Sequence, residues 1–594
     1  MQLPGAGARG AAMPSFVLLD DARATGAGQA RLYRDPVETI VAHARDEVAP
    51  ALDRLRAALA AGRHAAGFLS YEAGLALEAR LAPLGRAATD APPPLLWFGV
   101  FETVEHVDPA TVLPDPAGAF VGRPQPRVDR ADYDAAVAEA LRLIVAGDIY
   151  QVNLTFPAHV MVLGDPRAAY ARLRAAQEVR CGGLVFTGSH WLLSASPELF
   201  FTLEGRAIVA RPMKGTLART HHSDPATLAT DAKNRAENLM IVDLIRNDLA
   251  RVAEAGSVAV PKLFEVESYR TIHHMTSTVT ATLAPGRDAV AIIEALFPCG
   301  SVTGAPKIRA MEVIDALEPC PRGPYTGSIG WLDPPNGSGC GEASFNVAIR
   351  TLVLRDGEPM GTLGLGSAIV ADSDAAAEWR ECLVKGAFVD RASPEFDLIE
   401  TMRFDAEEGL AEVERHLARL KASAQALGFA FDRHDARNEL QAATFRLRKH
   451  ARVRLLLARS GRIAIESRPL PAHPPEPVEV ALAPLPVTSA DWRLAHKTTD
   501  RGFYDAARVG AGAFETIFAD HDGFLTEGSF TSLFVERDGT FVTPPLSRGL
   551  LPGILRAKLI DEGRAHEGDL RAEDLAGGFL IGNALRGLIR ARLK

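Results

Sequence analysis

A proline-rich stretch in the last third does most to limit how this 594-residue chain can fold. Seven prolines fall between Pro469 and Pro486, and proline neither continues a helix nor donates a hydrogen bond inside a sheet. The stretch is therefore predicted to be an extended, semi-rigid connector. A second joint is expected at Arg391-Ala392-Ser393-Pro394, because the pattern of strands and helices starts again after it.

With a further surface connection at 109–126, rich in Pro, Gly and Asp, these joints divide the chain into four regions, and the mixture of strands and helices predicts an α+β multidomain protein. The regions are residues 1–125, 126–391, 392–490 and 491–594, and the joint at 391 separates two larger modules. Hydrophobic periodicity and cap residues predict helices at 48–61, 130–146, 231–250 and 412–427. Strands are expected at 67–72, 185–187, 194–203, 345–354, 396–403 and 452–458. No internal repeat is visible in the sequence.

Charge and composition exclude several classes of protein. The net charge of −9 leaves no basic excess to neutralise phosphates, so nucleic acid is not the expected partner. No apolar run is long enough to span a membrane, and the Gly/Ala-rich residues 1–13 lack the apolar core of a signal peptide. The 5 cysteines form no C-x-x-C pair, so neither a zinc site nor a disulfide framework is expected. A reducing cytoplasm is the simplest location.

Lys214 is the first candidate functional residue. It stands in Pro212-Met213-Lys214-Gly215-Thr216 and is expected on a turn, where the plainest interpretation is a solvated lysine. The helix predicted at 231–250 is apolar on nearly every side and is expected to be buried, yet it carries several charges. Buried charges are costly unless they are paired or bound to metal. An ion-pair network explains Asp243, Arg246 and Asp248 well, but it explains Glu237 less well.

Two further glutamates lie far along the chain. Glu378 and Glu381 are spaced for one helix face, and Lys385 follows Glu381 by one turn. A surface ion pair is the plain interpretation, and an oxygen cage with Glu237, which would suit Mg²⁺, is the alternative. The glycine-rich loop 300–307 does not fit the phosphate-loop pattern, so nucleotide binding is not expected. Free backbone N–H groups at the helix start still favour a carboxylate.

Taken together, these stretches resemble the chorismate-utilising enzymes. The residues that carry the resemblance, in order, are Ser196-Pro197-Glu198, Pro212–Thr216, Arg235–Leu244, His273–Ser277, Gly300–Lys307, Ile349-Arg350-Thr351 and Ile369–Ser373. The resemblance implies a large sandwich of antiparallel sheets with helices that binds chorismate. One departure from the family is Gly366-Ser367-Ala368, where the family has a glycine triplet. The first hundred residues match only loosely, and the resemblance leaves open whether they keep the tryptophan pocket of some relatives.

The resemblance also implies residue roles. Lys214 would be a nucleophile towards C2 of chorismate, which requires a deprotonated amine, and Glu198 would be the general acid and base. Relatives that use water carry a lysine where Gln151 stands, and anthranilate synthases usually carry alanine where Lys214 stands. The implied substrate contacts are Gln151, His274, Thr303, Tyr325, Arg350, Gly366 and Lys385. The implied Mg²⁺ ligands are Glu237 and Glu381, with Glu378 nearby.

The second module resembles the class IV pyridoxal-phosphate enzymes, which include aminotransferases and aminodeoxychorismate lyase. The matching stretches are Glu414–Leu420, His496–Thr499, Leu525–Ser529 and Leu551–Arg556. The resemblance implies a two-lobed fold in which Lys497 holds the cofactor covalently and Glu527 bonds its pyridine nitrogen. The implied phosphate contacts are Arg419, Gly553, Ile554 and Asn583. Tyr504 is a looser candidate for cofactor binding, and Ser532 stands where many relatives have asparagine.

The fusion of these two modules favours one pair of reactions. Amination of chorismate would give 4-amino-4-deoxychorismate, and elimination of pyruvate would then give 4-aminobenzoate, a folate precursor. None of the cysteines lies in a glycine-flanked nucleophile elbow, so a separate glutamine amidotransferase is expected to supply ammonia. The alternatives are an anthranilate synthase fused to a class IV aminotransferase, and an inactive scaffold that binds chorismate-like ligands. The second module is also compatible with a homodimer.

Overall fold

The computed structural model describes residues 13–23, 28–85, 91–219, 224–268, 272–335, 340–392 and 394–594. The start of the chain, where no signal peptide is expected, and Ser393 of the predicted joint lie outside the described residues. The chain forms two compact units. The first comprises residues up to Pro116, Arg123–Val162 and Pro166–Ala392, and the second comprises Ala117–Gly122, Leu163–Asp165 and Ser393–Lys594. No described helix is both long enough and apolar enough to cross a membrane.

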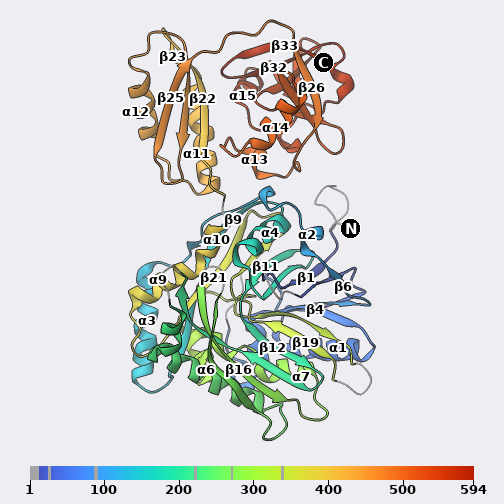
Figure 1. Ribbon diagram of the computed structural model, residues 1–594, viewed down its shortest axis with the longest axis vertical. Coiled ribbons are helices and arrows are strands. Elements are labelled where there is room, and N and C mark those ends of the chain that lie inside the picture. Colours follow the sequence, from blue (N-terminus) through green and yellow to red (C-terminus); the bar gives the residue numbers. More distant parts are fainter. Residues whose placement is uncertain are drawn as a thin grey trace. The chain divides into compact units, whose positions relative to one another are not determined.

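The first unit contains two large sheets whose recorded pairings are antiparallel (Figure 1). The first sheet includes, in order, β17 (Gly304–Ala305), β9 (Gln151–Gly164), β21 (Met360–Ile369), β20 (Thr351–Arg355), β11 (His190–Ser196), β10 (Cys181–Phe186), β1 (Phe16–Asp20), β2 (Ala30–Arg34) and β6 (Glu105–Val107), and β8 (Gln125–Pro126) also pairs with β9. The second consists of β14 (Met213–Ala218), β16 (Ile272–Thr282), β13 (Ala207–Arg211), β12 (Leu199–Glu204), β19 (Glu342–Asn346), β18 (Ser328–Asp333), β4 (His64–Leu69), β5 (Leu96–Phe101) and β3 (Glu38–Ala42), and β15 (Ala259–Ser268) pairs with β16. The N-terminal strands therefore extend both sheets.

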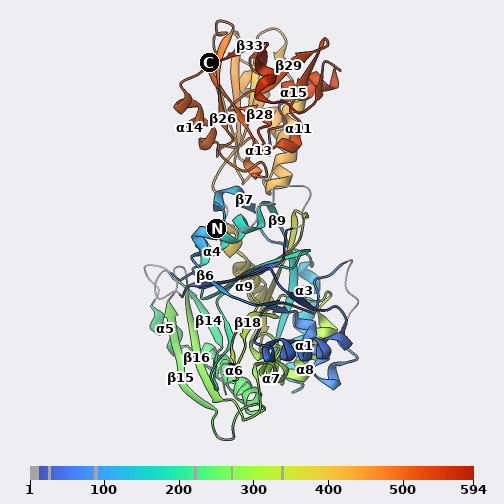
Figure 2. The ribbon, with the colours of Figure 1, turned by 90° about the vertical axis from the view of Figure 1, so that its right-hand side faces the viewer.

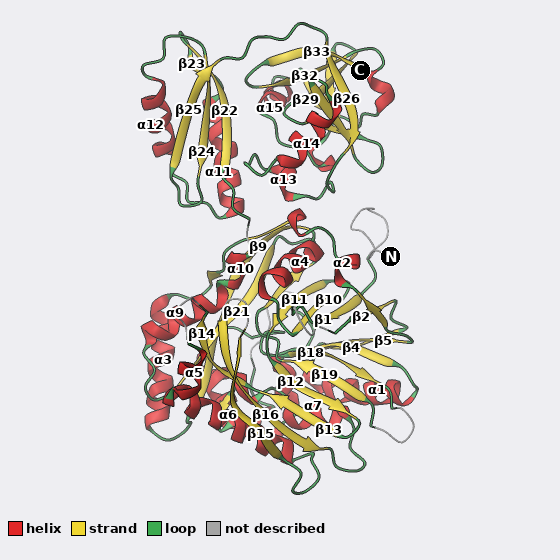
Figure 3. Ribbon diagram, in the orientation of Figure 1, coloured by secondary structure: helices red, strands yellow, loops and turns green. Residues whose placement is uncertain are grey.

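Apolar side chains fill the space between the two sheets. One cluster joins Val17, Val185 and Leu192 of the first sheet to Phe68, Trp97 and Ile329 of the second. A larger core lies between the second sheet and the helices α1 (Val48–Ala60), α6 (Ala232–Ala250) and α7 (Ala289–Leu296). Helices α3 (Arg130–Val145) and α9 (Ala375–Gly386) pack against β21. Figure 3 shows this arrangement of sheets and helices, which confirms the predicted α+β class.

The structure corrects three details of the predicted elements in this unit. Helix α6 was expected to be buried, but Leu239 is 52% exposed and the Asp243 side chain is 75% exposed. Only one face of α6, with Ile241, Ile245 and Leu249, enters the core, so the Asp243–Arg246 pair is a solvated surface pair. The strand expected at 194–203 is two strands, β11 and β12, because the chain turns at the proline between them. The strand expected at 345–354 is also two strands, β19 in the second sheet and β20 in the first, because the chain crosses between the sheets at residues 347–350.

The second unit has two lobes, which are seen apart in Figure 1 and overlap in the view of Figure 2. The first lobe is a sheet in the order β23 (Gly409–Leu410), β22 (Leu398–Asp405), β24 (Ala451–Leu457) and β25 (Ile463–Pro469), packed on α11 (Val413–Leu427) and α12 (Arg433–Thr444). The second lobe is a mixed sheet in the order β28 (Leu525–Gly528), β27 (Glu515–Ala519), β26 (Val478–Pro484), β33 (Gly587–Leu593), β32 (Phe579–Asn583), β29 (Ser532–Arg537), β30 (Thr540–Thr543) and β31 (Ala565–Glu567). Helices α14 (Gly502–Ala511) and α15 (Ile554–Asp561) belong to this lobe.

The proline-rich connector is shorter than predicted. Residues 478–484 form β26, a central strand paired in parallel with β27 and β33. Pro477 precedes this strand and Pro484 ends it, and at these two positions proline does not interrupt the hydrogen bonds of the sheet. Periodicity alone could not separate the strand from the prolines on either side of it.

Candidate active sites

Lys214 lies in strand β14, so the predicted turn is wrong. The strand contains a bulge, because Lys214 pairs with Met275 whereas Thr216 pairs with His274. Gly215 takes up the extra residue with φ of +81°, a left-handed conformation that favours glycine. A Cβ atom at Gly215 would also lie 2.9 Å from the Asn234 side chain of α6. Gly215 therefore allows a strand with a local kink where the sequence suggested a turn.

Charged groups of both signs surround the half-buried Lys214 side chain. Burial lowers the pKa of Lys214, and the positive charge of Lys385 adds to the effect. The carboxylates of Glu237, Glu198 and Glu381 oppose it. The structure thus brings together residues from β14, α6, α9 and the turn after β11. A lysine attacks as the free amine, so a lowered pKa favours a role as nucleophile.

Glu198 is a buried carboxyl group beside this lysine. Burial raises the pKa of Glu198 to about 7, while the Ser301 hydroxyl, Lys214 and the Met213 backbone N–H act in the opposite direction. Its Oε1 atom has no hydrogen-bond partner among the residues that the structure describes. A carboxyl group with a pKa near neutrality can both give and take a proton at physiological pH.

The basic residues predicted to bind substrate lie around the same point. Burial, followed by the charge of Arg350, lowers the pKa of His274 to about 3, so the imidazole is neutral. Arg350 has a φ of +50°, a strained conformation for a residue with a side chain, and it donates to Gln177 Oε1 at 3.1 Å. Lys385 pairs with Glu381 at 2.7 Å and donates to the Gly366 carbonyl at 3.1 Å. Arg350 and Lys385 therefore supply positive charge to the site.

The uncharged predicted residues form the walls. Gln151 is fully buried, and neither polar atom of its side-chain amide has a hydrogen-bond partner within the described ranges. The Thr303 hydroxyl donates internally to the carbonyls of Cys299 and Gly300. Tyr325 packs against Gly364 so closely that a Cβ atom there would lie 2.0 Å from the ring. A buried amide without partners is costly in a folded protein, so Gln151 fits a position that faces a polar ligand.

The serine in the altered glycine triplet has a contact of its own. The Ser367 side chain is buried, and its hydroxyl lies 3.2 Å from the Tyr133 hydroxyl of α3. A Cβ atom at the neighbouring Gly366 would lie 2.7 Å from the Thr155 side chain, so this glycine is required. The departure at Ser367 is thus accommodated by a partner outside the strand.

The three predicted Mg²⁺ ligands differ in their surroundings. Glu378 is buried and accepts from the Ser373 hydroxyl at 2.7 Å, whereas Glu381 is half exposed and pairs with Lys385. Within the described residues, no group of three His, Cys, Asp or Glu side chains is placed to hold a metal ion. Mg²⁺ needs only one or two carboxylates together with substrate and water oxygens. Glu237 and Glu381, whose charges both act to raise the pKa of Lys214, fit that requirement better than Glu378 does.

A buried ion pair, not noticed in the sequence, fixes the walls of this site. Arg322 donates to both carboxylate oxygens of Glu318, and also to the carbonyls of Val302 and Asn153 at 2.8 and 2.6 Å. Glu318 in turn accepts from the Thr155 N–H at 2.7 Å. The pair therefore joins the strand that carries Gln151 to the loop that carries Ser301 and Thr303. The i,i+4 spacing in the sequence was its only signal.

The second unit contains a cavity of about 680 Å³. Six of the seven residues predicted to bind the pyridoxal cofactor line it: Arg419, Lys497, Glu527, Gly553, Ile554 and Asn583. Tyr504 does not line the cavity. It is buried behind Glu527 and donates its hydroxyl to Glu527 Oε1 at 3.0 Å.

The carboxylate of Glu400 interacts electrostatically with Lys497 and forms hydrogen bonds with Arg419. Burial lowers the pKa of Lys497 to about 7, with Glu400 opposing the effect and Arg419 adding to it. Arg419 donates to Glu400 at 2.9 and 2.7 Å and to the Pro552 carbonyl at 2.9 Å. The N-terminus of α15 begins directly after Gly553 and faces the same cavity. Arg419 and this helix N-terminus together suit a phosphate group.

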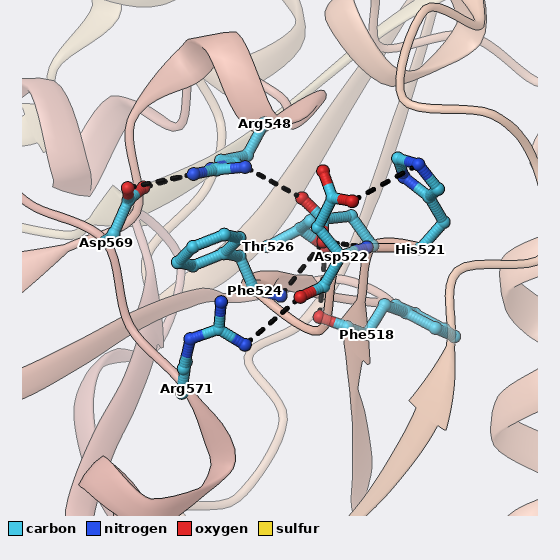
Figure 4. Close-up of polar contacts among 9 residues, drawn as sticks. Phe518, His521, Asp522, Phe524, Thr526, Arg548, Asp569 and Arg571 are labelled. Carbon is cyan, nitrogen blue, oxygen red and sulfur yellow. Dashed lines mark hydrogen bonds and ion pairs between the residues drawn. The ribbon is translucent and has the colours of Figure 1, made fainter. Parts of the chain in front are cut away.

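Glu527 is held at the cavity wall by its own strand hairpin. Burial raises the pKa of Glu527 to about 7, and the Leu551 N–H donates to its Oε1 at 3.1 Å. Figure 4 shows the turn between β27 and β28, where Phe524 lies between the guanidinium groups of Arg548 and Arg571. Asp520 accepts from the Phe524 N–H at 2.9 Å and from Arg548 at 3.3 Å. These contacts fix the hairpin three residues before Glu527.

Glu515 is a second carboxylate that sequence reasoning missed. It accepts from the N–H groups of Ser529 and Phe530 at 2.9 and 3.1 Å, and from the Thr531 hydroxyl at 2.8 Å. These three residues line the cavity. Glu515 therefore shapes the loop that follows Glu527.

The fold and the first site define the chain as a chorismate-binding enzyme. Residues 15–391 match the family described as chorismate binding enzyme, which is more than half of the chain, and the chain belongs to that family. Residues 397–593 match class IV amino-transferases. The chain is thus an enzyme that joins two catalytic families.

Particular relatives refine this assignment. The chain is 42% identical over 268 residues to aminodeoxychorismate synthase component 1 of Escherichia coli (strain K12), an alignment that covers 44% of this chain and 57% of that protein. It is 39% identical over 315 residues to anthranilate synthase component 1 of Streptomyces coelicolor, an alignment that covers 52% of this chain and 58% of that protein. A crystal structure of anthranilate synthase component I from Streptococcus pneumoniae matches with 27% identity and a TM-score of 0.52, covering 60% of this chain and 91% of that one. The chain spans less than two thirds of the length of the two curated relatives, the aminodeoxychorismate synthase component 1 and the anthranilate synthase component 1.

Proposed function

We propose that this chain makes 4-aminobenzoate from chorismate and ammonia in two steps. The first unit would form 4-amino-4-deoxychorismate, and the second would release pyruvate from it. The observation that carries the proposal is Lys214, which lies beside Glu198 with a lowered pKa. The 42% identity to aminodeoxychorismate synthase component 1 supports the same reaction. Anthranilate synthase component 1 is a relative at 39% identity and is the alternative for the first step.

In the proposed first step, Lys214 is the nucleophile. Its amine adds to C2 of chorismate, and the C4 hydroxyl leaves as water with a proton from Glu198. Ammonia then adds at C4 and the bond between Lys214 and C2 breaks, which returns the lysine. Arg350 and Lys385 would bind the substrate carboxylates, and Gln151 would present its amide to the ring. Mg²⁺, held by Glu237 and Glu381, would neutralise the ring carboxylate.

We predict that the pH dependence of this step reports Glu198. Burial holds its pKa at about 7, so the acid form that protonates the departing hydroxyl is lost as the pH rises through 7. Once the pH exceeds the pKa values of both Glu198 and Lys214, whose free amine is also required, the kcat/KM for chorismate at a fixed concentration of free ammonia should fall about tenfold per pH unit. Glu198→Gln should lose most of the rate together with this alkaline limb. If the variant kept the same alkaline limb, a group other than Glu198 would be responsible for that limb.

The proposed ammonia source is a glutamine amidotransferase partner. Cys299 is the cysteine whose sequence comes nearest to a nucleophile elbow, but it is buried and its Sγ atom lies 3.2 Å from the Ser301 hydroxyl. Burial raises the pKa of its thiol to about 12, so the reactive thiolate is not formed at neutral pH. This supports amination by ammonia from a separate protein.

In the proposed second step, Lys497 moves the proton of the reacting carbon. Pyridoxal phosphate, when bound, would supply an electron sink for the substrate amine. Lys497, whose pKa is lowered to about 7, would take the C4 proton, after which the C3–O bond breaks and pyruvate leaves. Glu527 would bond the pyridine nitrogen, and Arg419, Ile554 and Asn583 would hold the phosphate. The ring becomes aromatic, which drives the elimination.

The test is one incubation of the purified chain with chorismate, ammonium, Mg²⁺ and pyridoxal phosphate. The expected products are 4-aminobenzoate and pyruvate in equal amounts, identified by chromatography and a coupled pyruvate assay. Anthranilate as the main aromatic product would favour the alternative first step. An absence of both products, with no visible absorbance of bound cofactor, would favour a binding protein without catalysis.

A further inference from the structure

The cavity around Lys497 carries more positive charge than one cofactor phosphate needs. Arg419 and the N-terminus of α15 suit the phosphate, and Arg419 is already paired with Glu400. Five other arginines line the cavity: Arg452, Arg454, Arg501, Arg508 and Arg586. The acidic residues in the same lining are Asp505 and Glu527, and Glu527 is engaged by Tyr504 and Leu551. The excess of cations points to further anionic groups in the ligand.

Two of these arginines project from one face of strand β24. Arg452 and Arg454 are two residues apart, so their side chains share a face, while Val453 and Leu455 between and after them are fully buried on the opposite face. The strand partner of Arg454 on β22 is Thr401, which also lines the cavity. The Nε atoms of both arginines are buried and have no hydrogen-bond partner among the described residues.

Two more arginines lie on helix α14 and the residue before it. Arg501 and Arg508 are seven residues apart, which places them on one helix face. Arg501 donates to the Ser529 carbonyl at 3.3 Å, but its Nη1 atom is buried and has no hydrogen-bond partner in the described part of the chain. Arg508 is 3.6 Å from Asp505, and its Nε atom is likewise buried with no hydrogen bond to any described residue. Buried guanidinium N–H groups without acceptors are costly, so an anionic ligand would relieve both pairs.

We infer that the two arginine pairs are two carboxylate-binding subsites, one on β24 and one at α14. The cavity is therefore selective for a ring substrate with two carboxylates over one that carries a single carboxylate. This inference deepens the proposed function of the second unit and rests on it. A substrate with one carboxylate would leave the buried N–H groups of one arginine pair without an acceptor, which makes its binding weaker.

Two probes that differ by one carboxylate test this inference. The first is 3-(carboxymethoxy)benzoate, which carries a ring carboxylate and a second one through an ether oxygen, and the second is 3-methoxybenzoate. Titration calorimetry of the full chain, saturated with pyridoxal phosphate, should show that the dicarboxylate binds roughly 10- to 100-fold more tightly, as expected for added hydrogen bonds to charged groups. Arg454→Ala and Arg508→Ala should each remove most of this preference.

Arg437→Ala is the matched control, because Arg437 lies on α12 against the other face of the sheet and its side chain is 51% exposed. It should keep the full preference. Arg454→Lys keeps the charge but not the forked guanidinium, so it should bind the dicarboxylate with intermediate affinity. Equal binding of the two probes by the unaltered chain would overturn the inference, and so would a full preference in Arg454→Ala.

The outcome separates this inference from the proposed function. Calorimetry needs no chromophore, so the preference can be measured with inorganic phosphate in place of the cofactor. If the chain shows the preference but neither binds pyridoxal phosphate nor releases pyruvate, the two subsites are supported and the lyase function is contradicted. If it releases pyruvate without any preference for the dicarboxylate, the lyase function is supported and the two subsites are contradicted.

Discussion

Lys214→Ala is expected to reduce the formation of 4-amino-4-deoxychorismate by on the order of 10³-fold or more, since the variant lacks the proposed nucleophile. Consumption of chorismate with ammonium and Mg²⁺, followed by chromatography, measures this directly. Alanine is the residue that anthranilate synthases usually have at this position, so a low rate of anthranilate formation is the expected residual activity.

A matched control for Lys214 is Lys262→Ala on strand β15, which pairs with β16, where the lysine side chain is 60% exposed and pairs with Glu265. This variant should keep the full amination rate, because an exposed pair of this kind contributes about 1 kcal/mol or less to stability. If Lys214→Ala also kept the full rate, Lys214 would be a structural residue, and water or ammonia would have to attack the ring without it.

Lys497→Ala is expected to stop pyruvate release while amination continues. Its loss removes both the covalent hold on the cofactor and the group that moves the C4 proton, so the elimination should slow by on the order of 10³-fold or more. The variant should lose the visible absorbance of the covalently held cofactor, and 4-amino-4-deoxychorismate should accumulate. Continued formation of 4-aminobenzoate by this variant would contradict the assignment of the second unit.

Local sequence signals predicted many of the elements and named many of the residues that the structure brings together in the two candidate sites. The helices α3 and α11 begin and end within one residue of the expected positions, because their apolar spacing and glycine stops are strong. The cofactor cavity also contains six of the seven residues expected in it. These residues stand in short motifs whose order along the chain carries the resemblance.

Features that depend on tertiary contacts were not visible. The bulge at Gly215 needs the pairing with β16 and the Asn234 side chain, so Pro212 and Gly215 by themselves suggested a turn. The solvated face of α6 is set by which side of the helix meets the sheet. The arginines of the second cavity come from two lobes, and Arg452 and Arg454 differ from ordinary strand residues only by the cavity that they face.

Mixing the two variants tests the central claim most directly, because the account requires two separate sites that act in sequence on one diffusible intermediate. Lys214→Ala protein and Lys497→Ala protein would each be incubated alone with chorismate, ammonium, Mg²⁺ and pyridoxal phosphate, and then together. The account predicts little 4-aminobenzoate from either variant alone, and its formation with an equal amount of pyruvate from the mixture. If the mixture accumulated 4-amino-4-deoxychorismate without converting it, or if neither variant consumed chorismate, the assignment of two consecutive reactions to the two units would be contradicted.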